Sequence, residues 1–516
     1  MIEEQVPEIL GSLPKGISDC FLPWLERCPD REVLADSLGT WTYRQLSTAV
    51  NAASSWLLES GVRPGDRVML VCENCRVFAA LLLAMAQMDA WPVLVNARLS
   101  AQEVDQIREH SGARRILYTV SVSPQAKEHA KRHGASAQAL PEVGLFAESP
   151  LNDATQPEPV TGAQDSVAVL IYTSGTTGKP KGVMLTHRGL LFVAAVSARI
   201  RSLGPQDSLL GVLPMSHAVG LSVVLLGGLL SGARLQMAHR FDPVAVLSAL
   251  EKGQLTVMLG APAMFGLFVD YARMKGVGPR RFSALRIIAS AGAPLPANIK
   301  SDTEALFGLP LHNGYGVTEC SPTVAQTRVE APRSDLSIGR VFPGVEVKLV
   351  GCDSNPVPEG AVGELCARGP NMMKGYYRAP GETAAAIDPE GWYNTHDLAR
   401  FDDGNLFIVG RSKELIVRFG FNVYPAEVEA VFASHPAVAR CAVVGRPAQG
   451  EGDEEVVAFL ELAKGAEVAI PELAEYAAQK LAPYKRPSQI LIVDSMPMSP
   501  TGKVRKEELL KTVNAR

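Results

Sequence analysis

The most informative segment of the chain reads Val167-Ala-Val-Leu-Ile-Tyr-Thr-Ser-Gly-Thr-Thr-Gly-Lys-Pro-Lys-Gly-Val-Met-Leu-Thr-His187. Its first six residues form an apolar run that predicts a buried strand. The glycines that follow let the backbone turn tightly and bring N–H groups close to an anion, while hydroxyls and lysines add donors and charge. The spacing differs from a Walker A motif, and a plain surface turn would not need this density of donors. The segment therefore predicts a phosphate-binding loop formed by Thr173, Ser174, Gly175, Thr176, Thr177, Gly178, Lys179 and Lys181.

Strand and helix signals alternate on the N-terminal side of this loop. Apolar residues recur at helical spacing over 41–60 and 78–88, and buried strands are predicted at 66–71 and 91–95. Such alternation is typical of a parallel sheet with helices on its faces. The polar, Pro-rich stretch 149–166 is predicted to be a linker.

The pattern changes twice on the C-terminal side of the loop. Strand–helix alternation continues to about residue 320, and residues 335–410 then read as short strands with glycine turns. From about residue 412 the chain starts again with a mixture of helices and strands. We therefore expect a large N-terminal α/β domain, residues 1–412, with parallel-type sheets and a small β-rich subdomain. A smaller, mobile α+β domain, residues 413–516, is expected to follow.

Composition and charge exclude several classes of protein. The 516 residues are 47% hydrophobic and 20% charged, and the 50 basic and 54 acidic side chains give a net charge of −4. A nucleic-acid scaffold or a polybasic membrane binder would be strongly basic. The eight cysteines are too sparse for a disulfide framework, and the C-x-x-C pair Cys72 and Cys75 lacks two further ligands at zinc-like spacing. We therefore expect a reduced, cytoplasmic protein that does not bind nucleic acid.

Two stretches are apolar enough to be considered as membrane spans. Residues 78–95 are interrupted by Gln87, Asp89 and a proline, and residues 218–233 are interrupted by four glycines. Both are predicted to be buried core rather than transmembrane segments. The first five residues lack the basic start and apolar run of a signal peptide.

Seven further motifs follow in order along the chain. Together with the phosphate-binding loop they resemble the signature of the adenylate-forming superfamily, which contains acyl-CoA synthetases, firefly-type luciferases and the adenylation domains of peptide synthetases. The resemblance covers nearly the whole chain and implies ATP, Mg²⁺ and CoA as cofactors. The motifs are Leu213-Pro-Met-Ser-His217, Ser290-Ala-Gly-Ala-Pro294, Asn313-Gly-Tyr-Gly-Val-Thr-Glu319, Gly391-Trp-Tyr-Asn-Thr-His-Asp397, Gly410-Arg411-Ser-Lys-Glu414, Asn422-Val-Tyr-Pro425 and Pro500-Thr-Gly-Lys503.

The resemblance implies a nucleotide site. Tyr315 stands between two glycines, which leaves its ring free to stack on a purine. By resemblance, Asp397 accepts hydrogen bonds from the ribose hydroxyls, and Arg411 is a second ribose or phosphate contact. His396 stands where family members usually have glycine before this aspartate, so it is expected to crowd the site slightly. The other residues implied for the adenine slot are Ala291, Gly292, Ala293, Asn313, Gly314 and Gly316.

The resemblance also implies the catalytic groups. Glu319, beside Thr318, would hold Mg²⁺ together with Thr176, because a carboxylate next to a triphosphate needs a cation between them. His217 would lie between the acyl pocket and the α-phosphate. Lys503 would neutralise the negative charge that builds up in the transition state.

The second half of the implied reaction needs a different arrangement of the two domains. In the family the hinge lies two residues after the arginine of the Gly-Arg motif, which here is Lys413, and the small domain docks again so that a thiol can enter. Gly420 would let the backbone pass close to pantetheine. Phe419 and Phe421 depart from the Gly-Gly-Glu pattern that family members often have around this point.

The implied acyl pocket is apolar, so we expect a neutral hydrophobic acid, either fatty or aryl. No arginine follows Pro262 where relatives that take dicarboxylates have one, which argues against malonate-like acids. An amino acid would want an aspartate for its ammonium group, and none stands in the implied lining. The expected lining residues are Ala218, Val219, Leu221, Leu259, Ala291 and Gly314, with Met264 and Phe265 nearby.

These motifs imply an ATP-dependent acyl-CoA synthetase. A carboxylate would attack the α-phosphorus of Mg·ATP to give acyl-AMP and pyrophosphate, and the thiol of CoA would then displace AMP. Two alternatives stay open, namely a ligase that loads a carrier protein and a non-catalytic regulator that binds a nucleotide or an acyl group. The expected partners are a small-molecule carboxylic acid, ATP and CoA, and a homodimer is left open.

Overall fold

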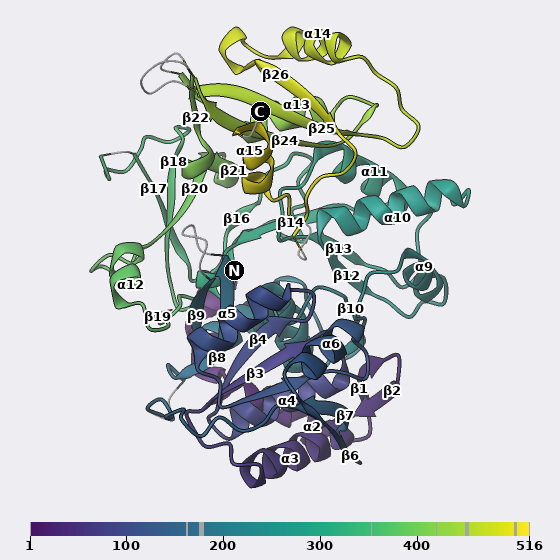
Figure 1. Ribbon diagram of the computed structural model, residues 1–516. Coiled ribbons are helices and arrows are strands. Elements are labelled where there is room, and N and C mark those ends of the chain that lie inside the picture. Colours follow the sequence, from purple (N-terminus) through teal and green to yellow (C-terminus); the bar gives the residue numbers. More distant parts are fainter. Residues whose placement is uncertain are drawn as a thin grey trace.

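The computed structural model describes residues 2–160, 162, 164–174, 180–351, 353–418, 421–448, 454–499 and 503–514. Two large mixed sheets form the framework (Figure 1). The first has the order β19 (Gly375–Tyr376), β9 (Pro180–Thr186), β8 (Val167–Ser174), β4 (Trp91–Asn96), β3 (Arg67–Cys72), β5 (Arg115–Tyr118), β7 (Gly144–Glu148) and β6 (Ser136–Leu140). Its central strands β8, β4, β3 and β5 run parallel, and the outer strands pair antiparallel.

Several of the predicted motifs lie at the ends of strands in the second large sheet. Its order is β16 (Arg340–Val341), β15 (Thr323–Gln326), β14 (Leu311–Gly316), β13 (Ile287–Ser290), β12 (Val257–Gly260), β10 (Ser208–Gly211), β11 (Arg234–Met237), β1 (Glu32–Asp36) and β2 (Gly39–Thr42). The strands from β14 to β1 are parallel. The prediction of parallel-type sheets is therefore confirmed, with antiparallel strands added at the edges.

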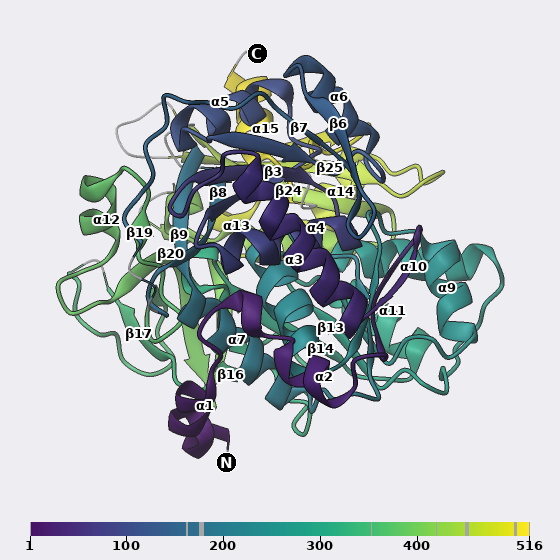
Figure 2. The ribbon, with the colours of Figure 1, turned by 90° about the horizontal axis from the view of Figure 1, so that it is seen from below.

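Helices lie between the two sheets, and most of their residues are buried. One hydrophobic cluster joins residues of both sheets to residues of these helices, so the helices form a shared middle layer (Figure 2). This position explains why residues 78–95 and 218–233 are so apolar, as expected for buried core. None of the helices in the described part of the chain has the length and apolar character needed to cross a bilayer. The layer comprises α3 (Tyr43–Glu59), α4 (Arg76–Gln87), α7 (His187–Ile200), η3 (Val219–Leu226) and α8 (Gly227–Ser231).

The outer faces of the sheets have their own helices and cores. Against the first sheet pack α5 (Ala101–Ser111) and α6 (Pro124–Arg132). Against the second pack α9 (Pro243–Glu251), α10 (Pro262–Met274) and α11 (Ala297–Phe307). The N-terminal region adds η1 (Ile2–Gln5), α1 (Val6–Ser12), η2 (Ile17–Asp19) and α2 (Leu22–Arg27), and α12 (Pro380–Ala386) follows β19.

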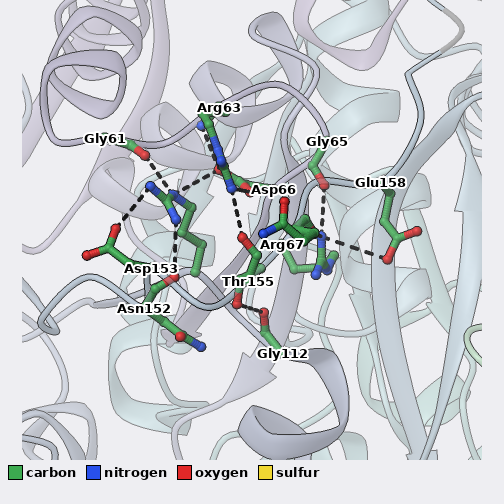
Figure 3. A network of polar contacts seen from close by, with 12 residues as sticks. Gly61, Arg63, Gly65, Asp66, Arg67, Gly112, Asn152, Asp153, Thr155 and Glu158 are labelled. Atoms are coloured by element: carbon green, nitrogen blue, oxygen red, sulfur yellow. Dashed lines mark hydrogen bonds and ion pairs between the residues drawn. The ribbon is translucent and has the colours of Figure 1, made fainter.

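The stretch 149–166 is not a linker, which corrects the prediction made from its composition. Described residues on both sides of it belong to the same sheet, because β7 precedes it and β8 follows it. Arginines that precede the strands β3 and β5 bind its carbonyl oxygens. Arg63 donates to Thr155 O over 2.8 Å (Figure 3), and Arg114 donates to Asn152 O over 3.1 Å. The prolines thus mark an extended segment that is fastened to the domain by hydrogen bonds.

The C-terminal third contains two smaller units. Antiparallel strands β17 (Glu346–Val350), β18 (Gly363–Arg368), β20 (Tyr393–Asp402) and β21 (Asn405–Arg411) form the β-rich subdomain that was predicted for 335–410. The short turn η5 (Ser412–Glu414) then leads into a smaller domain with a core of its own. The exact boundary, 412/413, stays a prediction. The smaller domain contains β22 (Ile416–Arg418), β23 (Phe421–Val423), α13 (Pro425–Ala433), β24 (Val438–Pro447), β25 (Glu454–Leu462), α14 (Ile470–Lys480), η6 (Pro483–Lys485), β26 (Gln489–Val493) and α15 (Lys506–Asn514).

Candidate active site

Tyr315, Asp397 and Arg411 form one cluster, although they come from three strands. The Tyr315 hydroxyl donates a hydrogen bond to the Asp397 carboxylate, and Arg411 Nε lies 2.9 Å from Asp397 Oδ1. Asp397 and Arg411 are directly opposed in the β20–β21 register. Burial and then the charge of Asp397 raise the pKa of the Tyr315 hydroxyl, so Tyr315 stays a hydrogen-bond donor at neutral pH. The structure thus brings together the three residues that the resemblance assigned to adenine and ribose.

Gly316, the glycine after Tyr315, allows the backbone to pass very close to its neighbours. A Cβ at position 316 would lie 2.0 Å from the carbonyl oxygen of Pro322, so only glycine fits there. Ser290, at the end of β13, is the register partner of Asn313 on β14. A cavity opens at this edge of the sheet. Its lining includes Ser290, Ala291, Gly292, Asn313, Gly314, Tyr315 and Gly316, whereas the predicted Ala293 is not part of it.

Glu319 is held by a residue that the sequence did not single out. Glu319 lies in the turn η4 (Thr318–Cys320). The Tyr376 hydroxyl, from β19, donates to Glu319 Oε1 over 2.8 Å. Burial and the Glu319 charge raise the pKa of Tyr376, so this donor is present across the physiological range. The motif around Tyr376, Gly-Tyr-Tyr-Arg378, offered no signal beyond its aromatic residues.

The donor set around Glu319 fits a magnesium ion that is bound mainly through phosphates. Among the described residues, no group of three or more His, Cys, Asp or Glu side chains converges as a metal cage. One carboxylate whose Oε1 accepts from Tyr376 leaves Oε2 for a cation. Mg²⁺ commonly uses one or two carboxylates together with substrate phosphates and water. Glu319 with its neighbour Thr318 is compatible with that kind of site.

Lys503 reaches this region from the C-terminal domain. Burial and then the Arg411 cation lower the pKa of Lys503, while the carboxylates of Asp397 and Glu319 act in the opposite direction. Lys503 is nevertheless exposed to solvent. Lys503 also acts on His217, because burial and then the Lys503 charge lower the pKa of His217 to about 4. His217 is therefore neutral at pH 7 and can donate one hydrogen bond.

Contacts beside Lys503 hold the last segment of the chain against the large domain. Arg505 Nη2 lies 3.9 Å from Glu103 Oε1 of α5. Lys506 donates to Glu414, in the turn between the domains, over 2.6 Å. In this arrangement of the two domains, Lys503 lies close enough to Arg411, Asp397 and Glu319 for their charges to act on it.

Only part of the predicted phosphate-binding loop belongs to the described residues. Strands β8 and β9 form a hairpin in which Thr173 is paired with Lys181 and Ser174 with Pro180. Lys181 makes an ion pair with Glu382 and lies 5.1 Å from the ring centroid of Tyr376. The Lys181 charge is thus engaged by protein in this arrangement. The remaining predicted loop residues, Gly175, Thr176, Thr177, Gly178 and Lys179, lie outside the described residues.

Of the residues predicted for domain movement, Lys413 lies between the two domains. Lys413 is exposed in the turn η5. Phe421 stacks on Tyr484 with a centroid distance of 4.7 Å, so it packs within the small domain. Gly420 and Phe419 lie outside the described residues.

His396 does not crowd the site, which corrects the expectation. Its backbone has φ of +56°, a left-handed conformation that explains why glycine suits this position in relatives. The imidazole is exposed, with Nδ1 3.9 Å from Glu364 Oε2. The cost of the histidine is therefore conformational rather than steric.

The cavity at the end of β13 and β14 also contains part of the predicted acyl pocket. Its walls include Val219, Leu259, Ala291 and Gly314, as predicted. Ala218 and Leu221 are instead buried in the central core, and neither they nor Met264 and Phe265 line the cavity.

The expectation of a wholly apolar pocket is wrong. Arg201, His312, Gln326 and Thr327 also line the cavity. They come from the end of α7, from β14 and from the segment ending β15, so their common position depends on how these elements pack. Nothing in the local sequence around Arg201 marked it as a pocket residue.

Comparison with known proteins agrees with this geometry. Residues 21–377 match the model of the AMP-binding enzyme family, and residues 427–503 match that of the AMP-binding enzyme C-terminal domain. A feruloyl-CoA synthase from Amycolatopsis sp is 35% identical over 474 residues, which cover 91% of this chain and 93% of that protein. A 4-coumarate–CoA ligase from Pinus taeda is 32% identical over 94% of this chain and 93% of its own.

Solved structures show the same architecture. The ATP-bound structure of MatB from Rhodopseudomonas palustris has a TM-score of 0.84 and 26% identity, and the alignment covers 96% of this chain and 98% of that one. The o-succinylbenzoate CoA synthetase from Bacillus subtilis, in complex with its acyl-adenylate, has a TM-score of 0.81 and 27% identity over 95% and 97% of the two chains. The chain belongs to the AMP-binding enzyme family of the adenylate-forming superfamily and is an AMP-forming ligase of the acyl-CoA synthetase type.

Proposed function

We propose that the enzyme converts an aryl carboxylic acid into its CoA thioester in two steps. In the first, a carboxylate oxygen attacks the α-phosphorus of ATP, an acyl–phosphate bond forms and pyrophosphate leaves. In the second, the sulfur of CoA attacks the acyl carbon, and AMP leaves with the electrons of the broken C–O bond. The observation that carries the proposal is the position of Lys503, whose amine faces Glu319, Asp397 and His217 across the domain interface.

In the first step the substrate carboxylate approaches the phosphates of ATP, and the negative charge that builds up there must be stabilised. Lys503 supplies a mobile cation between the acid and the α-phosphate. His217, neutral because its pKa is about 4, donates a hydrogen bond there without adding charge. Mg²⁺ held at Glu319 would neutralise charge on the phosphates of ATP. Asp397 and Arg411 hold the ribose, so that the α-phosphorus is correctly oriented.

The second step requires the acyl carbon to be reached by a thiol. In the present arrangement the C-terminal domain occupies the approach to the site through Lys503. We propose that this domain rotates about Lys413, which removes the lysine and opens a path for pantetheine. The exposed position of Lys413 in the turn between the domains supports this hinge.

Aryl acids are favoured over fatty acids by the relatives. The most similar curated proteins include a feruloyl-CoA synthase and several 4-coumarate–CoA ligases, whose names specify arylpropenoic acids. The cavity beside Gly314 has walls from β13, β14 and η3, and its mainly apolar part suits the ring of an aromatic acid.

Release of AMP and pyrophosphate from Mg·ATP, measured with a panel of aryl and fatty acids with and without CoA, tests the proposal. CoA-dependent AMP release with arylpropenoic acids is the expected result. Pyrophosphate release that CoA does not accelerate would indicate a carrier protein as the acceptor. ATP binding without turnover for every acid would indicate a nucleotide-binding regulator and contradict the proposal.

A further inference from the structure

One end of the substrate cavity is polar. Arg201, the residue after α7, lines it together with His312 on β14 and Gln326 on β15. His312 is two residues before Gly314 on the same strand, which places it about 7 Å deeper along β14. The three side chains therefore lie at the end of the cavity that is remote from Gly316 and the catalytic groups.

The charge of Arg201 is not neutralised by an acidic side chain of the described residues. Its Nη1 donates to the Ser197 carbonyl over 3.2 Å, and its Nη2 donates to Gln326 Oε1 over 3.0 Å, so both acceptors are neutral. Burial lowers the pKa of Arg201 to about 10, which leaves the guanidinium charged at pH 7. Arg201 is half-buried, and a cation withdrawn from water without an anion is costly, so its retention calls for an explanation.

Other deeply placed arginines of the protein show the usual solution. Arg115 forms an ion pair with Glu148, and Arg328 lies 3.1 Å from Glu3. The Ser197 carbonyl belongs to the last turn of α7, so Arg201 also benefits from the negative end of the helix dipole. The helix dipole stabilises the part of the guanidinium that donates to the Ser197 carbonyl. It does not neutralise the part that faces the cavity and donates to Gln326 Oε1.

Beyond the two acceptors that bind Arg201, the neighbouring side chains in the cavity offer hydrogen-bond donors. Because Gln326 Oε1 accepts from Arg201, the amide orientation is fixed and Nε2 is the free end. Gln326 is only 4% exposed, and its Nε2 has no partner among the described residues. His312 is neutral at pH 7, since burial and then the Arg201 cation lower its pKa to about 4. A cation, a free amide N–H and a neutral imidazole together form a receptor for an anionic oxygen.

We propose that the acid substrate carries an anionic oxygen group at the end remote from its reacting carboxylate, and that Arg201 and Gln326 bind this group. The inference rests on the proposed function and specifies its substrate further. Two kinds of acid supply such an oxygen: an aryl acid with a second carboxylate, and a phenolic acid whose hydroxyl is ionised or strongly polarised by Arg201. Binding supplies the missing counter-ion of Arg201, so an acid without the group leaves this cation unpaired.

Three acids of matched shape test the proposal, namely cinnamate, 4-hydroxycinnamate and 4-carboxycinnamate. We expect kcat/KM for CoA-dependent AMP release to be at least about tenfold higher with one of the two oxygenated acids than with cinnamate. Preference for the 4-carboxy compound identifies a dicarboxylic substrate, and preference for the 4-hydroxy compound identifies a phenolic one. A wild-type enzyme that uses cinnamate as efficiently as both oxygenated acids would overturn the proposal.

Variants connect the preference to Arg201. Arg201→Gln is expected to bring the ratio of kcat/KM between the preferred acid and cinnamate close to one, and Arg201→Lys is expected to retain part of it. Arg199→Gln is the matched control, because Arg199 is exposed on the last turn of the same helix, and its ratio should equal that of the wild type. A ratio that survives in Arg201→Gln would refute the role of Arg201. If that variant does not fold, Gln326→Met serves in its place.

Binding without turnover separates this inference from the proposed function. The same three acids are added to the wild type and to Arg201→Gln in a thermal unfolding assay, with ATP present. A larger stabilisation by an oxygenated acid than by cinnamate, lost in the variant, supports the inference even if no acid is activated. Absence of AMP release with every acid would instead contradict the proposed function. Equal stabilisation by all three acids in the wild type would contradict the inference alone.

Discussion

Arg411 Nε lies 2.9 Å from Asp397 Oδ1, at facing positions of the antiparallel strands β20 and β21. The Tyr315 hydroxyl donates to the other carboxylate oxygen, so Asp397 holds an aromatic ring and a cation in fixed positions. Arg411 continues directly into η5, the turn that leads to the C-terminal domain. The nucleotide cluster and the connection between the domains are therefore adjacent in the chain.

Asp397→Asn is expected to raise KM for ATP by about tenfold or more. The change removes the charge that strengthens hydrogen bonds to ribose hydroxyls, and such bonds contribute roughly 1.5–3 kcal/mol. Steady-state kinetics with varied ATP provides the measurement. Asp402→Asn, an exposed position on the same strand, is the control and should keep the wild-type KM. An unchanged KM in Asp397→Asn would argue against ribose binding there.

Lys503→Ala is expected to slow formation of acyl-AMP by about 10²–10³-fold while leaving ATP binding nearly intact, because the lysine charge acts mainly in the transition state. Single-turnover pyrophosphate release measures this step. The reaction of synthetic acyl-AMP with CoA should be much less affected, since Lys503 leaves the site for it. Lys511→Ala, an exposed lysine of α15, serves as the control. Equal losses in both half-reactions would mean that Lys503 is needed throughout.

Tyr376→Phe is expected to raise the Mg²⁺ concentration for half-maximal adenylation by about tenfold. The hydroxyl orients Glu319 through a 2.8 Å hydrogen bond, and loss of such support typically weakens metal binding by 10–100-fold. The rate is measured against free Mg²⁺ at saturating ATP. Tyr377→Phe is a close control, because the Tyr377 hydroxyl donates to Glu158 instead. If both variants respond alike, Tyr376 has no special connection with the metal.

Acid is expected to destabilise the large domain through His187. Burial lowers the pKa of His187 to about 4, and its Nδ1 accepts a hydrogen bond from Ile17 N over 3.2 Å, which requires an unprotonated nitrogen. The unfolded chain, with a histidine pKa near 6.5, binds the proton first, so stability is complete above about pH 6.5 and falls as the pH decreases toward 4. The full effect is about 3 kcal/mol at pH 4.

Calorimetry at several pH values between 7 and 4.5 measures this loss. His187→Gln keeps a carbonyl acceptor for Ile17 and should reduce the decrease of the melting temperature with acid. His396→Gln, at an exposed histidine, should behave as the wild type. An identical pH dependence in all three proteins would exclude His187 as a source of acid sensitivity.

Several elements of the fold could be predicted from the sequence because they depend on neighbouring residues. The predicted helix 41–60 is observed at Tyr43–Glu59, where Thr42 and Gln45 form a capping box. The apolar run after residue 166 is β8, observed at Val167–Ser174. Local composition was misleading for 149–166, since prolines indicate an extended backbone but not the arginines that bind it.

The candidate site likewise combines residues that the sequence identified with a residue that it did not. Motifs identified Tyr315, Asp397 and Lys503, because each stands among residues whose local chemistry is distinctive. Tyr376 was missed, since its role is to hold Glu319, 57 residues earlier in the chain. Such support depends on which strands become neighbours, and no short segment encodes that.

The amino-acid sequence alone determined the family and the fold class, and by resemblance it predicted which residues bind the nucleotide. Only the tertiary structure decided that the cavity proposed for the acid has a charged residue in its wall. Arg201 and Gln326 are separated by 125 residues and meet through the packing of α7 against the sheet that contains β15. Periodicity and turn chemistry act over a few residues, whereas burial and electrostatic partners follow from contacts between distant segments. The chemistry of the pocket therefore becomes visible only in the folded chain.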